Sequence, residues 1–274
     1  MDYSEWFEAV RNEGYYIDGG GPVFEEYLSG SLTPDEAATR ITAREPSRKF
    51  LPANSKIGAA WALFLFCAED CPEAHEAIID LLKSISALPK PTERGAADWT
   101  NEDARTAWGR LWRDSNDSLW SNTISKYRAD RSLATVPLSQ KWANYQSFSA
   151  ACVNKKVMDM DNEVFFALIL IIDVLEKEPT ISKLEMNIPA AAQWFLLAGK
   201  TILNQKIEKK EEVNCAWDKE SQVWKGKRGY SRERWVFWRE RWDVLGGIDG
   251  LSEETRDVCR KVTVAMGKVE RAKK

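Results

Sequence analysis

Histidine is nearly missing from this sequence, and several kinds of catalysis are improbable without it. His75 is the only histidine among 274 residues, so a serine or cysteine nucleophile would have one candidate imidazole base, which we expect at the surface. The GxSxG segment that exposes a nucleophilic serine is absent, and so are the GxxxxGK[ST] and GxGxxG phosphate-binding segments. The sequence therefore argues against serine or cysteine hydrolases and against dinucleotide-dependent redox enzymes.

Cysteine is scarce and scattered, with residues at positions 67, 71, 152, 215 and 259. A structural zinc site needs four Cys or His ligands at matched spacing, and only Cys67, Cys71 and His75 follow one another at four-residue intervals. Pro72 interrupts that series. We therefore interpret the thiols as reduced core residues, which favours the reducing cytosol and predicts a cytoplasmic protein.

Long apolar runs and an excess of positive charge are also absent. The most apolar stretches, 59–68 and 164–175, are too short to cross a bilayer. The 39 basic residues are balanced by 42 acidic ones, whereas nucleic-acid-binding domains usually have a strong basic excess. We expect a small-molecule ligand and neither a membrane nor a nucleic acid as partner, and the sequence favours no particular oligomeric state.

Signals for the beginning and end of helices are present along the whole chain. Thr33-Pro34-Asp35-Glu36 predicts a capping box with proline at the first helical position. Ser231 and Ser252 are predicted to cap two helices near the carboxyl end. Alternating strand patterns are nearly absent, and no internal repeat is found. We predict an all-α fold, with residues 1–274 forming a single domain of roughly ten packed helices.

Apolar residues at helical spacing locate further helices. They predict helices over 138–153 and 161–177. Another helix is expected to open at Pro189, because proline is favourable at the first helical position.

Three segments near the carboxyl end show a family resemblance. They are IPAAAQWFLLAGKTIL from Ile188, VWKGKRGYSRERWVFWRERWDVL from Val223 and LSEETRDVCRKVTVAM from Leu251. With a PAAAQW helix, a WKGK element and an RWxxW helix in this order, they resemble a family of uncharacterised fungal all-helical proteins. The resemblance implies a helical, cytosolic protein of fungal origin, some of whose relatives accompany gene sets for specialised metabolism. It transfers no catalytic residue.

Tryptophan is unusually frequent, with 13 residues. Trp235, Trp238 and Trp242 share one helix face by their spacing. Core packing accounts for such rings in most proteins. The alternative is an aromatic-lined cavity between helices that binds a ligand or stabilises a cation. In that interpretation the substrate-binding tryptophans are Trp108, Trp112, Trp194, Trp235 and Trp238.

An acidic cluster is a candidate for metal binding. Asp159, Asp161 and Glu163 stand at the start of a predicted helix. They complement the helix dipole there or, alternatively, hold Mg²⁺ together with waters and a substrate phosphate. The cluster therefore makes Mg²⁺ the one cofactor that the sequence suggests.

A basic cluster follows in the WKGK element. Lys225, Lys227 and Arg228 lie in a glycine-containing loop, and Arg234 is in the first turn of the next helix. One interpretation is a solvated basic loop. The other is a binding site for an anion or a diphosphate, which loop amides, a helix N-terminus and cations can form together.

Two hypotheses about function result. The first is a small-molecule enzyme of fungal specialised metabolism, in its sharpest form a terpenoid-cyclase-like protein that acts on a prenyl diphosphate with Mg²⁺ in an aromatic-lined helical cavity. The usual DDxxD segment and Asn-Ser-Glu metal triad are absent, which argues against it. The second is a non-catalytic metabolite-binding or protein-interaction protein. The first requires the acidic and basic clusters to converge on one pocket.

Overall fold

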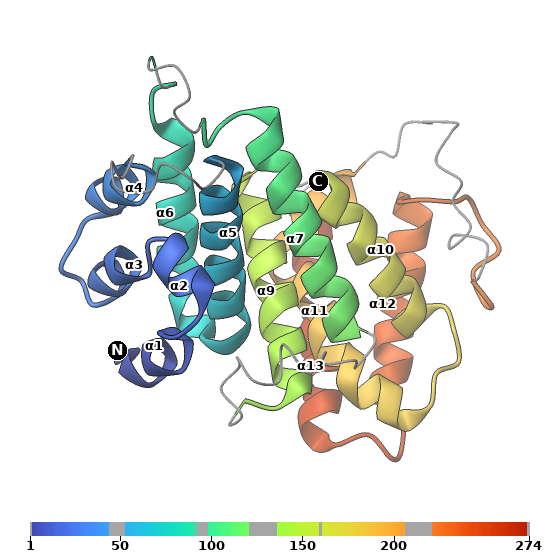
Figure 1. Cartoon of the computed structure of the whole chain (residues 1–274). Coiled ribbons are helices and arrows are strands. Elements are labelled where there is room, and N and C mark those ends of the chain that lie inside the picture. The colour runs from blue at the N-terminus through green and yellow to red at the C-terminus, as the bar shows by residue number, and fades with distance from the viewer. Residues whose placement is uncertain are drawn as a thin grey trace. The chain divides into compact units, whose positions relative to one another are not determined.

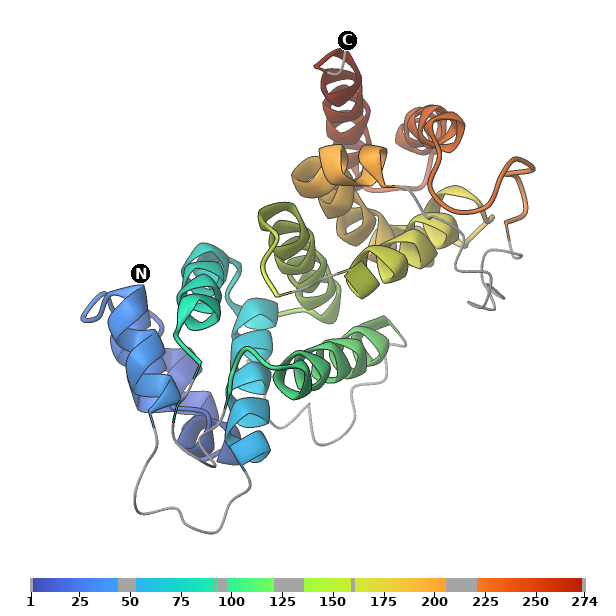
Figure 2. The ribbon, with the colours of Figure 1, turned by 90° about the horizontal axis from the view of Figure 1, so that it is seen from above.

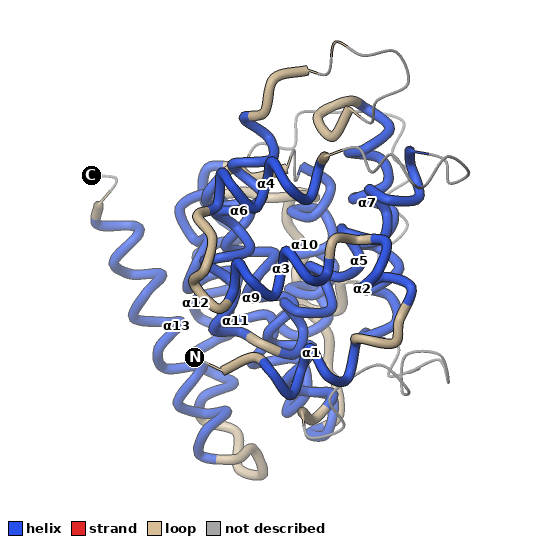
Figure 3. The backbone as a smooth tube through the Cα atoms, turned by 60° about the vertical axis from the view of Figure 1, so that its left-hand side comes forward, coloured by secondary structure: helices blue, strands red, loops and turns tan. Residues whose placement is uncertain are grey.

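The structure is a computed structural model of the whole chain (Figure 1). It describes residues 2–43, 53–90, 92, 98–120, 136–158, 161–205 and 221–272, without the side chains of 53–55 and 161–163. In these ranges the regular elements are helices and no strand occurs (Figure 3). The all-α prediction is therefore confirmed.

Contacts within the chain divide it into two compact units. Unit 1 consists of Met1–Phe148 and Lys156–Asp159, and unit 2 consists of Ser149–Lys155 and Met160–Lys274. The assignment of 1–274 to a single domain stays a prediction. No helix in the described ranges is both long and apolar enough to span a membrane.

Unit 1 is a group of helices around the apolar helix α5. Its elements are α1 (Ser4–Val10), α2 (Gly14–Asp18), α3 (Gly21–Leu28), α4 (Pro34–Thr42), α5 (Ala53–Asp70), the 3₁₀ turn η1 (Pro72–Ala74), α6 (His75–Ala87), α7 (Glu102–Trp120) and most of α9 (Leu138–Lys155). Helix α7 lies beside α5, and α4 lies beside α6 (Figures 1 and 2). The Trp61 indole N–H donates to the Ala104 carbonyl at 3.1 Å and so joins α5 to α7.

Helix α4 begins with the capping box that the sequence predicts at Thr33. The Thr33 hydroxyl accepts a hydrogen bond from the Glu36 amide at 3.3 Å, and the Glu36 carboxylate accepts one from the Thr33 amide at 2.9 Å. Both bonds of the predicted capping box at α4 are therefore present.

A buried ion pair connects α5 to α9 within unit 1. The Lys141 ammonium donates to the Asp70 carboxylate, and both side chains are almost inaccessible to solvent. The Trp6 indole N–H donates to the other carboxylate oxygen of Asp70 at 3.1 Å. The pair thus holds α1, α5 and α9 together through one carboxylate.

His75 is buried at the start of α6, which corrects the expectation of a surface histidine. Its Nε2–H donates to the Ala68 carbonyl at 2.8 Å. Burial penalises the charged imidazolium and lowers the pKa of His75 below its ordinary value. The neutral ring is therefore part of the core of unit 1.

Acidification should lower the free energy of unfolding of the native protein more than it lowers that of a His75→Gln variant. The unfolded chain takes up the proton first as the pH falls, because the pKa of His75 is lower in the folded state. The stability that the neutral ring contributes is complete above the unfolded pKa of about 6.5 and is lost below it, toward the folded pKa. Urea unfolding of both proteins between about pH 7.5 and pH 5 measures the difference. Since His75 is the only histidine, a pH-independent difference would contradict this assignment.

Within its described residues, unit 2 consists of the last residues of α9 and four further helices. These are α10 (Asp161–Leu175), α11 (Ile181–Asn204), α12 (Arg232–Gly246) and α13 (Glu253–Arg271), and both α11 and α12 pack on α13. The two predicted serine caps are confirmed. The Ser231 hydroxyl accepts from the Arg234 amide at 3.1 Å, and the Ser252 hydroxyl accepts from the Thr255 amide at 3.2 Å.

The prediction that a helix opens at Pro189 is wrong. Helix α11 begins at Ile181, after a Thr180 cap, and contains Pro189 in its interior. A proline inside a helix costs about 3 kcal/mol, which contacts to other elements offset here. The Glu185 carboxylate accepts hydrogen bonds from the hydroxyls of Ser252 and Thr255, at 2.9 and 2.5 Å. The Thr180 cap is a local signal, since its hydroxyl accepts from the Lys183 amide at 3.4 Å, and the prediction of a start at Pro189 overlooked it.

Candidate functional site

The tryptophans predicted to bind substrate are divided between the two units and are buried in both. Trp108 and Trp112 belong to unit 1, and Trp194, Trp235 and Trp238 belong to unit 2. None of the five is more than 3% exposed. Their described geometry is that of core packing, and a substrate-binding role for them stays a prediction.

In unit 2 the aromatic face of α12 surrounds one phenylalanine. The Phe195 ring lies 5.6 Å from Trp235, 6.0 Å from Trp238 and 5.6 Å from Trp242, between ring centroids. Such tilted and edge-to-face pairs add about 0.5–1.5 kcal/mol each beyond the burial of area. The spacing of the three tryptophans along α12 predicted that they share one helix face. It could not predict that Phe195, which lies in another helix, contacts all three.

The WKGK element is a compact turn before α12. The Trp224 indole N–H donates to the Lys227 carbonyl at 2.9 Å. A Cβ at Gly226 would lie 2.2 Å from the Trp224 ring, so only glycine fits there. Lys225, Lys227 and Arg228 are exposed on this turn. The predicted anion-binding role of these three cations stays a prediction.

Arg234 is buried, unlike the three exposed cations of the turn. Its guanidinium makes two hydrogen bonds to the Glu176 carboxylate, at 2.6 and 2.8 Å, and a third to the Gly229 carbonyl at 2.9 Å. The side chains of Arg234 and Glu176 are both 0% exposed. The Trp238 indole N–H also donates to Glu176, at 2.7 Å. Arg234 thus anchors the WKGK turn to the end of α10.

Tyr230 holds the same turn from its other end. Its hydroxyl donates to the Val164 carbonyl of α10 at 2.7 Å, and burial raises the pKa of this phenol. Together with Arg234, Tyr230 makes the segment 221–231 a fixed part of unit 2. The three exposed cations therefore project from a held backbone.

The predicted magnesium ligands lie outside the described residues. Asp159 is not described, and of Asp161 and Glu163 only the backbone at the start of α10 is described. In the remaining described part of the chain, no three His, Cys, Asp or Glu side chains form a group suited to a metal ion. Mg²⁺ binding by the predicted ligands therefore stays a prediction.

The described cysteines agree with their interpretation as core thiols. Cys67, Cys71, Cys152 and Cys259 are buried and form no disulfide, and Cys215 lies outside the described residues. Burial raises the pKa of Cys67, and it raises that of Cys259 to about 12. Thiols protonated at neutral pH are poor nucleophiles.

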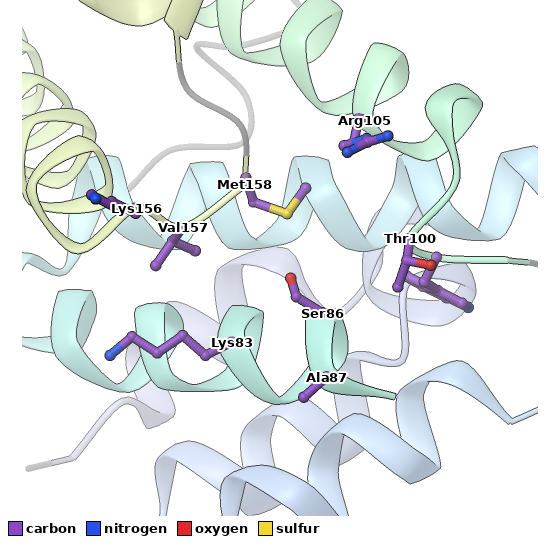
Figure 4. Close-up of a pocket in the computed structure, with 9 residues that line it drawn as sticks. Lys83, Ser86, Ala87, Thr100, Arg105, Lys156, Val157 and Met158 are labelled. Atoms are coloured by element: carbon purple, nitrogen blue, oxygen red, sulfur yellow. The ribbon is translucent and has the colours of Figure 1, made fainter. Parts of the chain in front are cut away.

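A cavity of about 430 Å³, lined by described residues of unit 1, is a candidate ligand site (Figure 4). It lies between α6, the start of α7 and the turn that follows α9. Its volume is within the range of about 300–1,000 Å³ that is typical of small-molecule sites. The nine lining residues are Lys83, Ser86, Ala87, Trp99, Thr100, Arg105, Lys156, Val157 and Met158.

The lining of this cavity is positively charged. Lys83, Arg105 and Lys156 are cations, and none of the nine residues is acidic, although the net charge of the whole chain is −3. The nearest described acid of α6 is Asp80, which pairs with Lys83 at 3.0 Å. Both partners of that pair are half exposed, and such pairs contribute only about 0–1 kcal/mol. An anion in the cavity can therefore replace Asp80 as the partner of Lys83.

Two hydroxyl groups of the lining are already hydrogen-bonded. The Thr100 hydroxyl and amide donate to the Asp98 carboxylate at 2.8 and 2.9 Å, and these bonds lower the pKa of Asp98. The Ser86 hydroxyl donates to the Leu82 carbonyl at 2.8 Å. Both oxygens keep only acceptor capacity for a ligand, so the donors that an anion needs come from the three cations.

The turn after α9 has an unusual backbone. Lys156 and Met158 have φ angles of 54° and 62°, in the left-handed region that residues other than glycine seldom adopt. Each such residue costs about 1–3 kcal/mol, and such strain concentrates at ligand and active sites. Both strained residues line the cavity, which favours a functional role for this turn.

Trp99 forms the aromatic part of the lining. It is 5% exposed, and its ring meets Trp61 edge to face with 5.3 Å between centroids. Its indole N–H has no acceptor among the described groups. A buried donor without a partner costs about 1–3 kcal/mol.

Sequence reasoning missed this cavity. Lys83, Arg105 and Lys156 come from three separate segments, and no local motif connects them. Each taken alone is an ordinary surface cation. The fold brings them together, and only the left-handed turn at 156–158 makes Lys156 and Met158 part of the same wall.

Comparison with known proteins gives a family and no function. A family model described as "Protein of unknown function (DUF3632)" matches residues 61–242. No curated protein and no solved structure matches the chain. Membership in an uncharacterised family is therefore confirmed, whereas the fungal origin stays a prediction. The match begins well before the carboxyl-terminal segments that suggested the resemblance and ends before the third of them, which starts at Leu251.

Proposed function

We propose that this chain, which belongs to the DUF3632 family of proteins of unknown function, binds an anionic small molecule in the cavity of unit 1. The observation on which the proposal rests is the lining of three cations and no acid in a chain of negative net charge. A bound anion gains charge-assisted contacts with these cations. Specific anions should therefore stabilise the folded protein.

Anion binding is tested by calorimetric titration of the full chain at fixed ionic strength. The probes are inorganic phosphate, diphosphate, citrate and simple carboxylates. A probe at a hundred times its dissociation constant should add about 2.7 kcal/mol to the free energy of unfolding, which raises the Tm by a few degrees. Stabilisation that matches sodium chloride at equal ionic strength, with no heat of binding, would sink the proposal.

Replacing Arg105 with methionine should weaken the binding of the best probe about tenfold to hundredfold. A hydrogen bond to a charged group contributes about 1.5–3 kcal/mol, and methionine keeps the apolar bulk without the charge. Arg110→Met is the matched control, because Arg110 is exposed on the same helix and does not line the cavity. Equal loss of affinity in the two variants would locate the anion elsewhere.

A terpenoid-cyclase-like enzyme that uses Mg²⁺ is the second candidate function. Its support is the helical fold and a cationic cavity that suits a diphosphate group. Against it, the described tryptophans of the predicted site are packed in the cores, and Trp99 is the one aromatic residue of the cavity lining. A prenyl diphosphate that stabilises the chain only with Mg²⁺, with the effect abolished by Asp161→Ala, would support this function and justify product analysis.

A further inference from the structure

Two lysines of the cavity lining direct their charges to the same side of the cavity. In Figure 4 the ammonium ends of Lys83 and Lys156 both point to this side. Lys83 pairs with Asp80 while both side chains stay half exposed, and no described acid pairs with Lys156. Arg105, by contrast, already has an interaction within the protein. The two lysines are therefore the cations best placed to receive a new anion.

A phosphate monoester suits two ammonium groups better than a carboxylate does. Its charge at neutral pH is about −1.5 to −2, and it offers three strong acceptor oxygens. A carboxylate has a single charge and two oxygens. Since each lysine ammonium has three rotatable donors, Lys83 and Lys156 can both donate to one phosphate group.

The two hydroxyl groups of the lining complement another part of a ligand. The Ser86 hydroxyl donates to the Leu82 carbonyl, and the Thr100 hydroxyl donates to the Asp98 carboxylate, both at 2.8 Å. Because their protons are already used, both oxygens can only accept a further hydrogen bond. A ligand that satisfies them needs donors of its own. Amines are unfavourable donors among three cations, so hydroxyl groups fit best.

The acceptors follow the lysines in a fixed order. Lys83 and Ser86 are three residues apart on α6, which places their Cβ atoms about 5–6 Å from each other on one helix face. In Figure 4 the Ser86 hydroxyl points toward Met158, and Thr100 lies on the far side from the two lysines. A chain of hydroxyl groups that begins at a phosphate would therefore pass Ser86 first and Thr100 later.

We infer that the ligand is a phosphorylated polyol, a phosphate monoester whose carbon chain carries free hydroxyl groups. This inference rests on the proposed function and deepens it. The phosphate would meet Lys83 and Lys156, and the hydroxyl groups would donate to Ser86 and Thr100. Neither a simple carboxylate nor an alkyl phosphate satisfies both parts of this lining.

The test compares probes that differ in one kind of group. Sorbitol 6-phosphate, hexyl phosphate, gluconate and inorganic phosphate are titrated calorimetrically into the full chain at fixed ionic strength. Hexyl phosphate lacks the hydroxyl groups, and gluconate has a carboxylate in place of the phosphate. We expect sorbitol 6-phosphate to bind about tenfold more tightly than each of the other three, because it alone uses both kinds of contact.

A variant at Ser86 tests the hydroxyl contact. Ser86→Ala should weaken the binding of sorbitol 6-phosphate about threefold to tenfold and leave that of inorganic phosphate unchanged, since it removes one neutral acceptor. Ser118→Ala is the matched control. The Ser118 hydroxyl donates to the Asp114 carbonyl at 2.7 Å, four residues earlier in α7, and lies outside the lining. This control should change either affinity less than about twofold.

A variant at Lys156 tests the phosphate contact. Lys156→Asn should weaken the binding of sorbitol 6-phosphate and of inorganic phosphate alike, each about tenfold. Asparagine tolerates the left-handed backbone that Lys156 has, with φ 54°, so the turn is kept. Lys90→Asn, at an exposed position outside the lining, should change both affinities less than about twofold.

The contrary outcomes are distinguishable. If hexyl phosphate or gluconate binds as tightly as sorbitol 6-phosphate, or if Ser86→Ala has no more effect than Ser118→Ala, the phosphorylated polyol is wrong and the proposed anion binding survives. The same holds if only other anions, such as citrate or diphosphate, bind. If no anion binds, the inference and the proposed function fail together.

Discussion

Replacing Glu176 with glutamine should lower the free energy of unfolding of unit 2 by about 3–5 kcal/mol. The substitution keeps the size of the side chain and removes its charge. The Arg234 guanidinium, which is fully buried, then loses the carboxylate that accepts two of its hydrogen bonds. Because Glu176 also accepts from the Trp238 indole, the loss extends from the WKGK turn to the aromatic face of α12.

Urea unfolding measures the loss, and amide hydrogen exchange across residues 232–246 assigns it to α12. Asp173→Asn is the matched control, because it makes the same chemical change in a partly exposed pair with Lys177 at 2.6 Å. We expect that control to cost less than about 1 kcal/mol. Similar losses in the two variants would show that the Glu176 pair contributes no more than a surface pair.

The second large effect is expected in unit 1, where Lys141→Met should cost about 3–5 kcal/mol. Methionine fills most of the space of the lysine side chain, so packing is largely kept. The Asp70 carboxylate, which is buried and accepts from the Trp6 indole, loses its cation. Thermal and urea unfolding measure the change in stability.

A double variant separates charge from packing. Lys141→Met with Asp70→Asn removes the charge of the carboxylate as well, and the asparagine oxygen still accepts from Trp6. It should recover part of the loss, and Lys83→Met, which breaks the half-exposed pair with Asp80, should cost less than about 1 kcal/mol. A double variant that is less stable than Lys141→Met alone would contradict this explanation.

Local features of the fold could be predicted from the sequence. The capping box at Thr33 and the caps at Ser231 and Ser252 use atoms within three residues of one another. The common face of Trp235, Trp238 and Trp242 results from the helical period. The start of α11 was missed because Pro189 was taken as the first helical position, although the Thr180 hydroxyl forms a local cap with the Lys183 amide.

In the candidate site, too, local signals could be predicted and contacts between distant residues could not. Arg234 was correctly singled out as an important cation, but its partner Glu176 lies in another helix, and burial makes the two an anchor of the turn. Lys83, Arg105 and Lys156 gave no signal, because each contributes to the cavity only after α6, α7 and the turn after α9 have packed.

The sequence by itself determined the all-helical class, the main caps and the aromatic faces, since these depend on composition and on spacing along one helix. The tertiary structure alone decided which charges are buried as pairs and which line a cavity. The physical reason is that burial and charge pairing depend on groups that are close in space and distant in the chain. For this protein, the presence of Lys83, Arg105 and Lys156 in the lining of one cavity is therefore a property of the fold.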